Sequence, residues 1–196
     1  MYLVKRLEKS PKEKVIIIFS GGNTDMKKPY KRTEAEEMMK LFNNIDSQKS
    51  ENLIKIKEDR SLSTIENLIN SKKILEKLRL GNARVNIFCD KLRSYRVETL
   101  ASEIFNNFEI ISYKFAGNKY KKVKRLIKEK ERLGIKYYLW AMKDKDNWKI
   151  YRKNLKERLR ILRNTPPNKW NEVEVEIWKK AIKEFKENPY WKKELN

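Results

Sequence analysis

Short apolar runs alternate with longer amphipathic segments along the first part of the chain. Four such runs stand at residues 15–19, 53–56, 85–89 and 108–115. Their β-branched and aromatic side chains, followed by polar residues, predict strands. The first run, VIIIF, is apolar at every position, which is typical of a central parallel strand covered by helices on both faces. The sequence therefore predicts a mostly parallel sheet.

Between these runs, apolar side chains recur at the three- and four-residue spacing of a helix face. Thr33 with Glu36, and Ser63 with Glu66, have the spacing of capping boxes and mark the starts of two helices. A third helix follows the run at residues 85–89. Strands that alternate with helices need crossover connections. We therefore predict an α/β fold, a three-layer Rossmann-like and mostly parallel sheet.

Beyond residue 116 the pattern is mainly helical. Helical periodicity covers residues 120–136, 146–163 and 172–186. The aromatic residues 137–140 suggest a short strand, and Pro166 with Pro167 separates the last two helices. We predict two parts, an α/β core at residues 1–116 and a helical C-terminal extension at residues 117–196 that packs on the core.

The positive charge is concentrated in the second part. The whole chain has a formal net charge of +21. Residues 1–116 hold 23 Lys or Arg against 16 Asp or Glu, whereas residues 117–196 hold 25 against 11. A basic extension with Trp and Tyr residues suits nucleic acid or an acidic membrane surface. The alternative is a Lys-rich composition that places lysine on every solvated face, and the sequence leaves both open.

Two absences narrow the chemistry. The chain has no His, which removes the usual general base and every catalytic triad that needs an imidazole. Cys89 is the single cysteine, so neither an internal disulfide nor a thiolate metal site is predicted, and a packed small side chain is its expected role. The longest apolar run is far shorter than the roughly 20 residues of a membrane helix. We expect a cytoplasmic protein without a membrane span.

In an open α/β sheet, ligands bind beyond the carboxyl ends of the strands. The segment after the first run reads Ser20, Gly21, Gly22 and Asn23. Its two glycines allow a ligand to approach the backbone closely. A simple tight turn explains the same residues.

A second polar segment, EDRSLSTIEN at residues 58–67, leads into the next helix. Capping the start of this helix needs only Ser63 and Glu66. Five further polar residues surround the same helix start: Glu58, Arg60, Ser61, Thr64 and Asn67. Buried polar groups must be paired, because each unsatisfied one costs about 1–3 kcal/mol. Pairing with one another or with a ligand would both meet this need.

The third segment follows the run at residues 85–89. Arg93 and Arg96 stand three positions apart, a spacing that could present two guanidinium groups to a phosphate or carboxylate. Two solvated arginines are the alternative.

These segments together resemble the YdcF/SanA/ElyC family. The motifs are FSGG at residues 19–22, TEAE at 33–36, EDRSLSTIEN at 58–67, and Arg96. The high Lys and Arg content and the extension are more similar to the family's eukaryotic and archaeal branch. Many bacterial members carry a His where Arg93 stands, so no role of that imidazole applies here.

The resemblance implies a Rossmann-like fold with a small-molecule or nucleotide site, and a bacterial relative is associated with S-adenosylmethionine. It does not imply a reaction. The family pattern places these residues at the pocket: Ser20, Gly21, Gly22, Glu34, Glu58, Arg60, Ser61, Thr64, Glu66, Asn67 and Arg96.

Three functions follow as hypotheses. In the first, the Gly21 and Gly22 amides and Arg96 hold the anionic group of a small ligand, and Glu34 would be the base if a reaction occurs. In the second, FSGGNTD acts as the ATP loop of an ATP pyrophosphatase, although Thr24 and Asp25 depart from the SGG-x-D-S pattern. In the third, the basic extension binds nucleic acid or an anionic surface.

Overall fold

The computed structural model describes residues 14–24, 31–45, 52–114 and 124–187. Contacts within the chain divide it into two compact units, Met1–Gly81 and Asn82–Asn196. Both units combine strands with helices, which agrees with the predicted α/β class. The predicted boundary between residues 116 and 117 lies outside the described residues, and that division stays a prediction.

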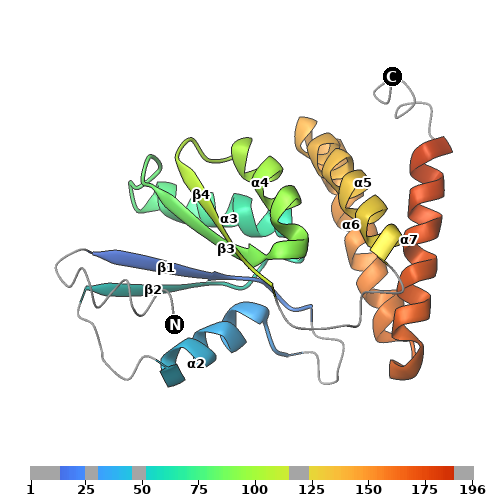
Figure 1. Ribbon diagram of the computed structural model, residues 1–196, viewed down its shortest axis with the longest axis horizontal. Coiled ribbons are helices and arrows are strands. Elements are labelled where there is room, and N and C mark those ends of the chain that lie inside the picture. Colours follow the sequence, from blue (N-terminus) through green and yellow to red (C-terminus); the bar gives the residue numbers. More distant parts are fainter. Residues whose placement is uncertain (1–13, 25–30, 46–51, 115–123, 188–196) are drawn as a thin grey trace. The chain divides into compact units, whose positions relative to one another are not determined.

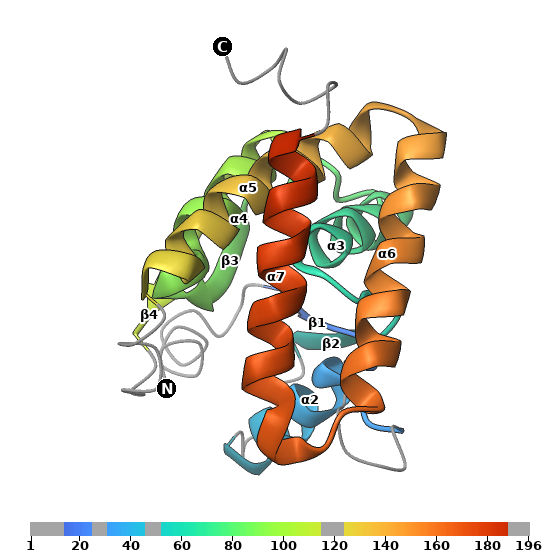
Figure 2. The same cartoon turned by 90° about the vertical axis from the view of Figure 1, so that its right-hand side faces the viewer.

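The first unit contains a parallel pair of strands between two helices. The strands are β1 (Val15–Ser20) and β2 (Leu53–Glu58), with Val15 opposite Leu53 and Ser20 opposite Glu58. The helices are α2 (Glu34–Ile45) and α3 (Thr64–Lys77). They lie on opposite faces of the strand pair in both views (Figures 1 and 2).

The alternation of side chains along β1 accounts for this arrangement, because successive side chains of a strand point to opposite faces. Phe19 packs on α2, with its ring centroid 5.5 Å from that of Phe42. Lys55 lies on the same face, with its Nζ 4.9 Å from the centre of the Phe42 ring. The next residue, Ser20, faces α3 on the other side of the strand pair, and its Oγ lies 3.4 Å from the Asn67 carbonyl oxygen.

Both predicted helix starts are present. Thr33 Oγ1 accepts the Glu36 amide at 3.2 Å, and Ser63 Oγ accepts the Glu66 amide at 3.4 Å. The Glu66 carboxylate accepts from the Leu62 amide at 2.6 Å. A capping box would use the amide of the cap residue itself, so the bond to Leu62 lies one residue earlier than in that motif.

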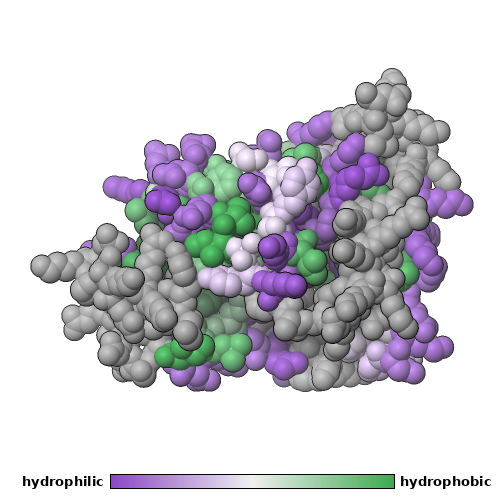
Figure 3. Space-filling model, viewed as in Figure 1, coloured by the Kyte–Doolittle hydropathy of each residue, from purple (hydrophilic) through white to green (hydrophobic). Residues whose placement is uncertain are grey.

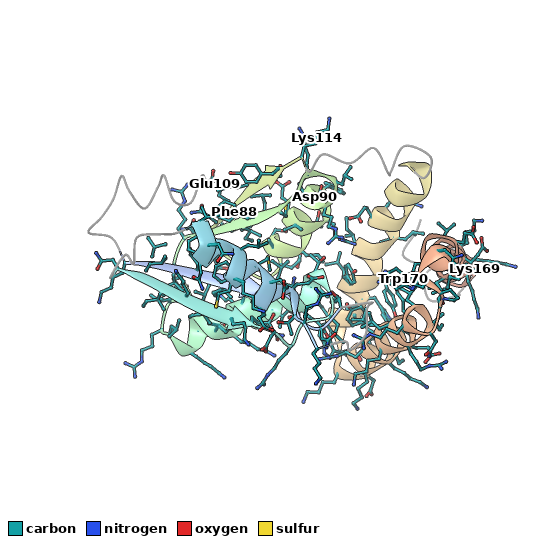
Figure 4. All side chains as sticks on the ribbon, turned by 90° about the horizontal axis from the view of Figure 1, so that it is seen from below. Phe88, Asp90, Glu109, Lys114, Lys169 and Trp170 are labelled. Carbon is teal, nitrogen blue, oxygen red and sulfur yellow. The ribbon has the colours of Figure 1, made fainter. Side chains whose placement is uncertain are left out.

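The second unit begins with another parallel pair, β3 (Val85–Asp90) and β4 (Phe108–Tyr113). The turn η1 (Lys91–Arg93) leads from β3 into α4 (Ser94–Ser102), which contacts both strands. Phe88 on β3 stacks on Tyr113 of β4 with ring centroids 6.5 Å apart. Figure 4 labels Phe88, and also Asp90 and Glu109 on the same strand pair.

Three longer helices complete this unit: α5 (Lys124–Lys143), α6 (Lys145–Arg163) and α7 (Trp170–Glu187). They pack against one another (Figure 2), and α5 also contacts α4. The short turn η3 (Pro167–Lys169) separates α6 from α7, where the sequence predicts a break. Trp170, labelled in Figure 4, donates its indole N–H to the Thr165 carbonyl at 2.8 Å and fixes the start of α7.

The predicted strand at residues 137–140 is wrong, since these residues lie within α5. The aromatic side chains pack between helices instead. Tyr138 meets the Tyr151 ring edge-on at 5.7 Å, and Trp148 lies 5.2 Å from the same ring. An aromatic cluster of this kind stabilises a helix pair as well as it would a sheet.

The described strands form two separate two-stranded parallel sheets, β1 with β2 and β3 with β4. The parallel direction and the alternation of strands with helices are thus confirmed. Within the described parts of the chain, no helix combines the length and the apolar character needed to cross a membrane.

The core of the first unit can be tested at Ile65, which is 0% exposed on α3. We expect Ile65→Ala to lower the free energy of unfolding by about 3 kcal/mol, because the change removes buried methyl groups and leaves a cavity. Ile45, at the end of α2, is 60% exposed, so Ile45→Ala should cost less than about 0.5 kcal/mol. Urea unfolding of both variants measures the difference. Equal losses would contradict the packing of α3.

Candidate functional site

The double glycine joins the end of β1 to the loop after β2. The Gly21 amide donates to the Glu58 carbonyl at 2.9 Å, and the Gly22 amide donates to the Ser61 carbonyl at 2.6 Å. Both amides therefore have protein acceptors. An anion at this place would have to be held by other donors.

The carbonyls of the same glycines fix the start of α2. The Glu34 amide donates to Gly22 at 3.1 Å and the Ala35 amide donates to Gly21 at 2.9 Å. These amides belong to the first turn of the helix, where no carbonyl of the helix itself can serve them. The Gly21–Gly22 segment thus links β1, α2 and the loop after β2.

Only glycine fits these two positions. Gly21 has a φ of +151°, and a Cβ added there would lie 2.7 Å from the Cβ of Glu34. A Cβ at Gly22 would collide with the Ser61 carbonyl oxygen and lie 2.9 Å from that of Asp59. At Gly22 this is a close approach of backbone to backbone, whereas at Gly21 the close neighbour is the Glu34 side chain.

A buried carboxylate stands at the centre of this region. Glu58, 5% exposed, is the last residue of β2. Its Oε2 accepts from the Ser20 hydroxyl at 2.7 Å and from the Ser61 hydroxyl at 2.6 Å. Its Oε1 accepts from the Arg60 amide at 3.0 Å and from the Asn70 side chain at 3.1 Å. We call these five residues the Glu58 network.

Asn70 was not among the predicted site residues, although it also donates to the Ser61 hydroxyl at 3.0 Å. Asn67, which was predicted, donates to the Ser20 carbonyl at 3.4 Å. Asn67 and Asn70 are three residues apart on α3 and therefore share a face of the helix. That spacing is the signal by which the sequence would have revealed Asn70.

Several predicted residues remain accessible around the glycines. The Thr24 hydroxyl donates to Glu34 Oε1 at 2.5 Å, and this carboxylate is exposed. Asn23 and Thr64 are partly exposed, and the Arg60 side chain is exposed. Two layers result, a buried network that holds the loops and an outer set of polar side chains that solvent or a ligand can reach.

The predicted arginine pair belongs to the second unit. Arg96 on α4 is 5% exposed, and its Nε lies 3.1 Å from Glu131 Oε2 of α5. The two atoms are close enough for an ion pair but are not aligned as a hydrogen bond. The guanidinium also lies 5.6 Å from the centre of the Tyr138 ring. Arg93 is exposed, so the two guanidinium groups do not share one environment.

The remaining chemical candidates give little support to catalysis. Cys89 is half-buried, and burial, followed by the charge of Asp90, raises the pKa of its thiol. A raised pKa keeps the thiol protonated and disfavours a nucleophile. Among the described residues, no three His, Cys, Asp or Glu side chains form a group that could hold a metal ion. Asp25 lies outside the described residues.

Comparison of the chain with protein-family models, with curated proteins and with solved structures gives no match. The resemblance to the YdcF/SanA/ElyC family stays a prediction that rests on the four sequence motifs.

The backbone contact at Gly22 gives a direct test. We expect Gly22→Ala to destabilise the protein by about 2 kcal/mol or more, because the new Cβ collides with the Ser61 carbonyl oxygen, which accepts the Gly22 amide. Gly81→Ala is the matched control, since its Cβ would lie 3.7 Å from the nearest atom, an ordinary contact. Thermal unfolding of both variants measures the effect. A Gly22 variant as stable as the Gly81 variant would refute the close approach.

Substitution of Arg96, the second arginine of the predicted pair, tests whether its role is structural. Removing its side chain leaves the largely buried Glu131 carboxylate without its close cation, so Arg96→Ala should lower stability by about 3 kcal/mol. Arg93→Ala removes the same charge from an exposed position and should change stability by less than about 0.5 kcal/mol. Chemical denaturation followed by circular dichroism distinguishes the two. If Arg96→Ala left the stability unchanged, Arg96 would again be a candidate for ligand contact.

Proposed function

We propose that the carboxyl ends of β1 and β2 bind a small ligand that carries an anionic group, and that Arg60 contacts this group. The observation that carries the proposal is the Glu58 network, which fixes the Arg60 backbone amide at 3.0 Å from a buried carboxylate while the Arg60 side chain is exposed. A preorganised loop lowers the entropy cost of binding. The exposed guanidinium suits phosphate or carboxylate.

Arg60 replaces the donors expected from sequence. The amides of Gly21 and Gly22 donate to carbonyls, and Arg96 is engaged with Glu131. The first turn of α2 is acidic, with three glutamates at residues 34, 36 and 37, so it disfavours an anion despite the helix dipole. Arg60 is thus the side chain in this region that best matches an anionic group.

Glu34 adds a second kind of contact. Its exposed carboxylate already accepts the Thr24 hydroxyl at 2.5 Å, and a carboxylate has further lone pairs for other donors. In dinucleotide-binding folds, an acidic residue near the strand ends accepts from ribose hydroxyls. A ligand with an anionic group and hydroxyl or amino donors, such as a nucleotide or S-adenosylmethionine, fits Arg60 and Glu34 together. We assign binding and no reaction.

The wider fold is part of the same proposal. We infer that the two parallel pairs belong to one three-layer Rossmann-like sheet, with residues 117–196 as a helical extension. The parallel pairing within each strand pair and the alternating helices support this inference. The apolar character of β1 also supports it, since both faces of such a strand need cover.

Ligand-dependent thermal unfolding tests the proposed site. Nucleotides, S-adenosylmethionine, sugar phosphates and inorganic phosphate are each added at increasing concentration. A ligand present at 100 times its dissociation constant stabilises by about 2.7 kcal/mol, which means a rise of roughly 5–10 °C in Tm for a chain of this length. We expect Arg60→Gln to abolish the rise.

Arg79→Gln is the control, because Arg79 is an exposed arginine of the same unit just beyond α3 and the change removes the same charge. It should leave the rise intact. Equal loss in both variants would point to nonspecific charge attraction. An unaltered rise in the Arg60 variant, or no rise with any ligand, would overturn the proposal.

A further inference from the structure

Helix α6 carries an ordered row of positive charge. Lys149, Lys153, Lys156 and Arg160 are all exposed and are spaced by four, three and four residues. That spacing keeps them on one side of a helix with 3.6 residues per turn. The side chains at the two ends are 76% and 66% exposed. We call these four residues the α6 basic row.

The row lies away from the apolar face of the same helix. Tyr151, Leu159 and Leu162 are the buried residues of α6, and at 100° per residue they fall about 90–170° from the centre of the row. The apolar face is engaged in packing with α5 and α7. The bundle thus holds α6 with its basic row directed to solvent.

The charge of α6 is not a general property of the chain. Hydrophilic residues are spread widely over the face of the protein in Figure 3, so lysine alone does not mark a site. However, α5 and α6 contain seven and eight Lys or Arg against two Asp or Glu each, whereas α7 contains four against five. A uniform lysine-rich composition would not produce this contrast between neighbouring helices.

Both acidic residues of α6 stand beside the row. Asp146 lies 2.7 Å from Lys149, and Glu157 lies 2.6 Å from Arg160. The hydrogen bond from Arg160 lowers the pKa of the Glu157 carboxyl. These pairs are exposed, and such pairs contribute little because solvent and salt screen them. A phosphate can therefore take the place of either carboxylate.

We propose that the α6 basic row binds the phosphate backbone of a nucleic-acid duplex without sequence preference. From Lys149 to Arg160 the row extends about 16 Å along the helix axis at 1.5 Å per residue. A duplex presents one negative charge per roughly 1.7 Å, so the row faces on the order of ten phosphates. Lys and Arg contacts of this kind give affinity but do not read bases.

Two other anionic partners fit less well. An amphipathic helix binds a membrane surface by burying its apolar face in the lipid boundary, and in α6 that face is already packed. Single strands are bound with aromatic stacking platforms. In α6, the Trp148 ring packs on Tyr151 with centroids 5.2 Å apart. The large apolar side chain that α6 exposes is Ile150, which is not aromatic and cannot stack on a base.

Salt-dependent binding to labelled duplexes tests the proposal with the full chain. Fluorescence anisotropy with a 20-base-pair DNA duplex, and with an RNA duplex of the same length, is measured from 50 to 300 mM NaCl. Each phosphate contact contributes about 0.9 to the slope of log affinity against log salt. We expect the triple variant Lys149→Gln, Lys153→Gln, Lys156→Gln to reduce the slope by two to three and to weaken binding at least tenfold at low salt.

The matched control places the same charge change on α7, with Lys179→Gln, Lys180→Gln and Lys183→Gln. It should change affinity by less than about threefold. Circular dichroism verifies that both variants stay folded. If the triple variant unfolds, the single variant Lys153→Gln takes its place and should reduce the slope by about one. Equal losses in both variants, a parent slope near zero, or stronger binding to phosphatidylserine vesicles than to both duplexes would overturn the proposal.

Discussion

Glu58 places a carboxylate where water hardly reaches it, at the end of β2. An ion in such a place is costly unless hydrogen bonds replace its hydration. Here the donors come from the end of β1, from the following loop and from α3, so that one side chain joins three elements. Bonds to an ionised acceptor are stronger than neutral ones. The position of the Gly21–Gly22 segment and of the Arg60 loop depends on this carboxylate.

Because the Glu58 carboxylate holds these loops, the polar residues after β1 and β2 fall into two groups. Ser20, Ser61 and Asn67 contact protein atoms and hold the loops in place. Residues such as Arg60 and Glu34 remain on the outside of that framework. A ligand that binds there would meet side chains on a rigid base, an arrangement that favours specificity because the geometry is set before binding.

Hydrophobic periodicity predicted the strands and most of the helices, since it reflects burial in each local segment. Both helix caps were also predictable, because a cap is a contact within three residues. The helical state of residues 137–140 was not, because aromatic side chains pack equally well on helices. The engagement of the Gly21 and Gly22 amides escaped prediction for another reason. Their acceptors lie almost 40 residues away, and a single sequence does not reveal such a pairing.

The contact between Gly22 and Ser61 also constrains how related sequences can vary in length. The Ser61 carbonyl receives the Gly22 amide, and the Ser61 hydroxyl reaches back to Glu58. Inserting or deleting one residue between Glu58 and Ser61 would move one of these groups out of reach. The interval from the carboxylate to the serine should therefore stay fixed in any homologue that keeps this framework, even where overall identity has decayed. That interval, together with the two glycines, offers a search pattern for distant relatives.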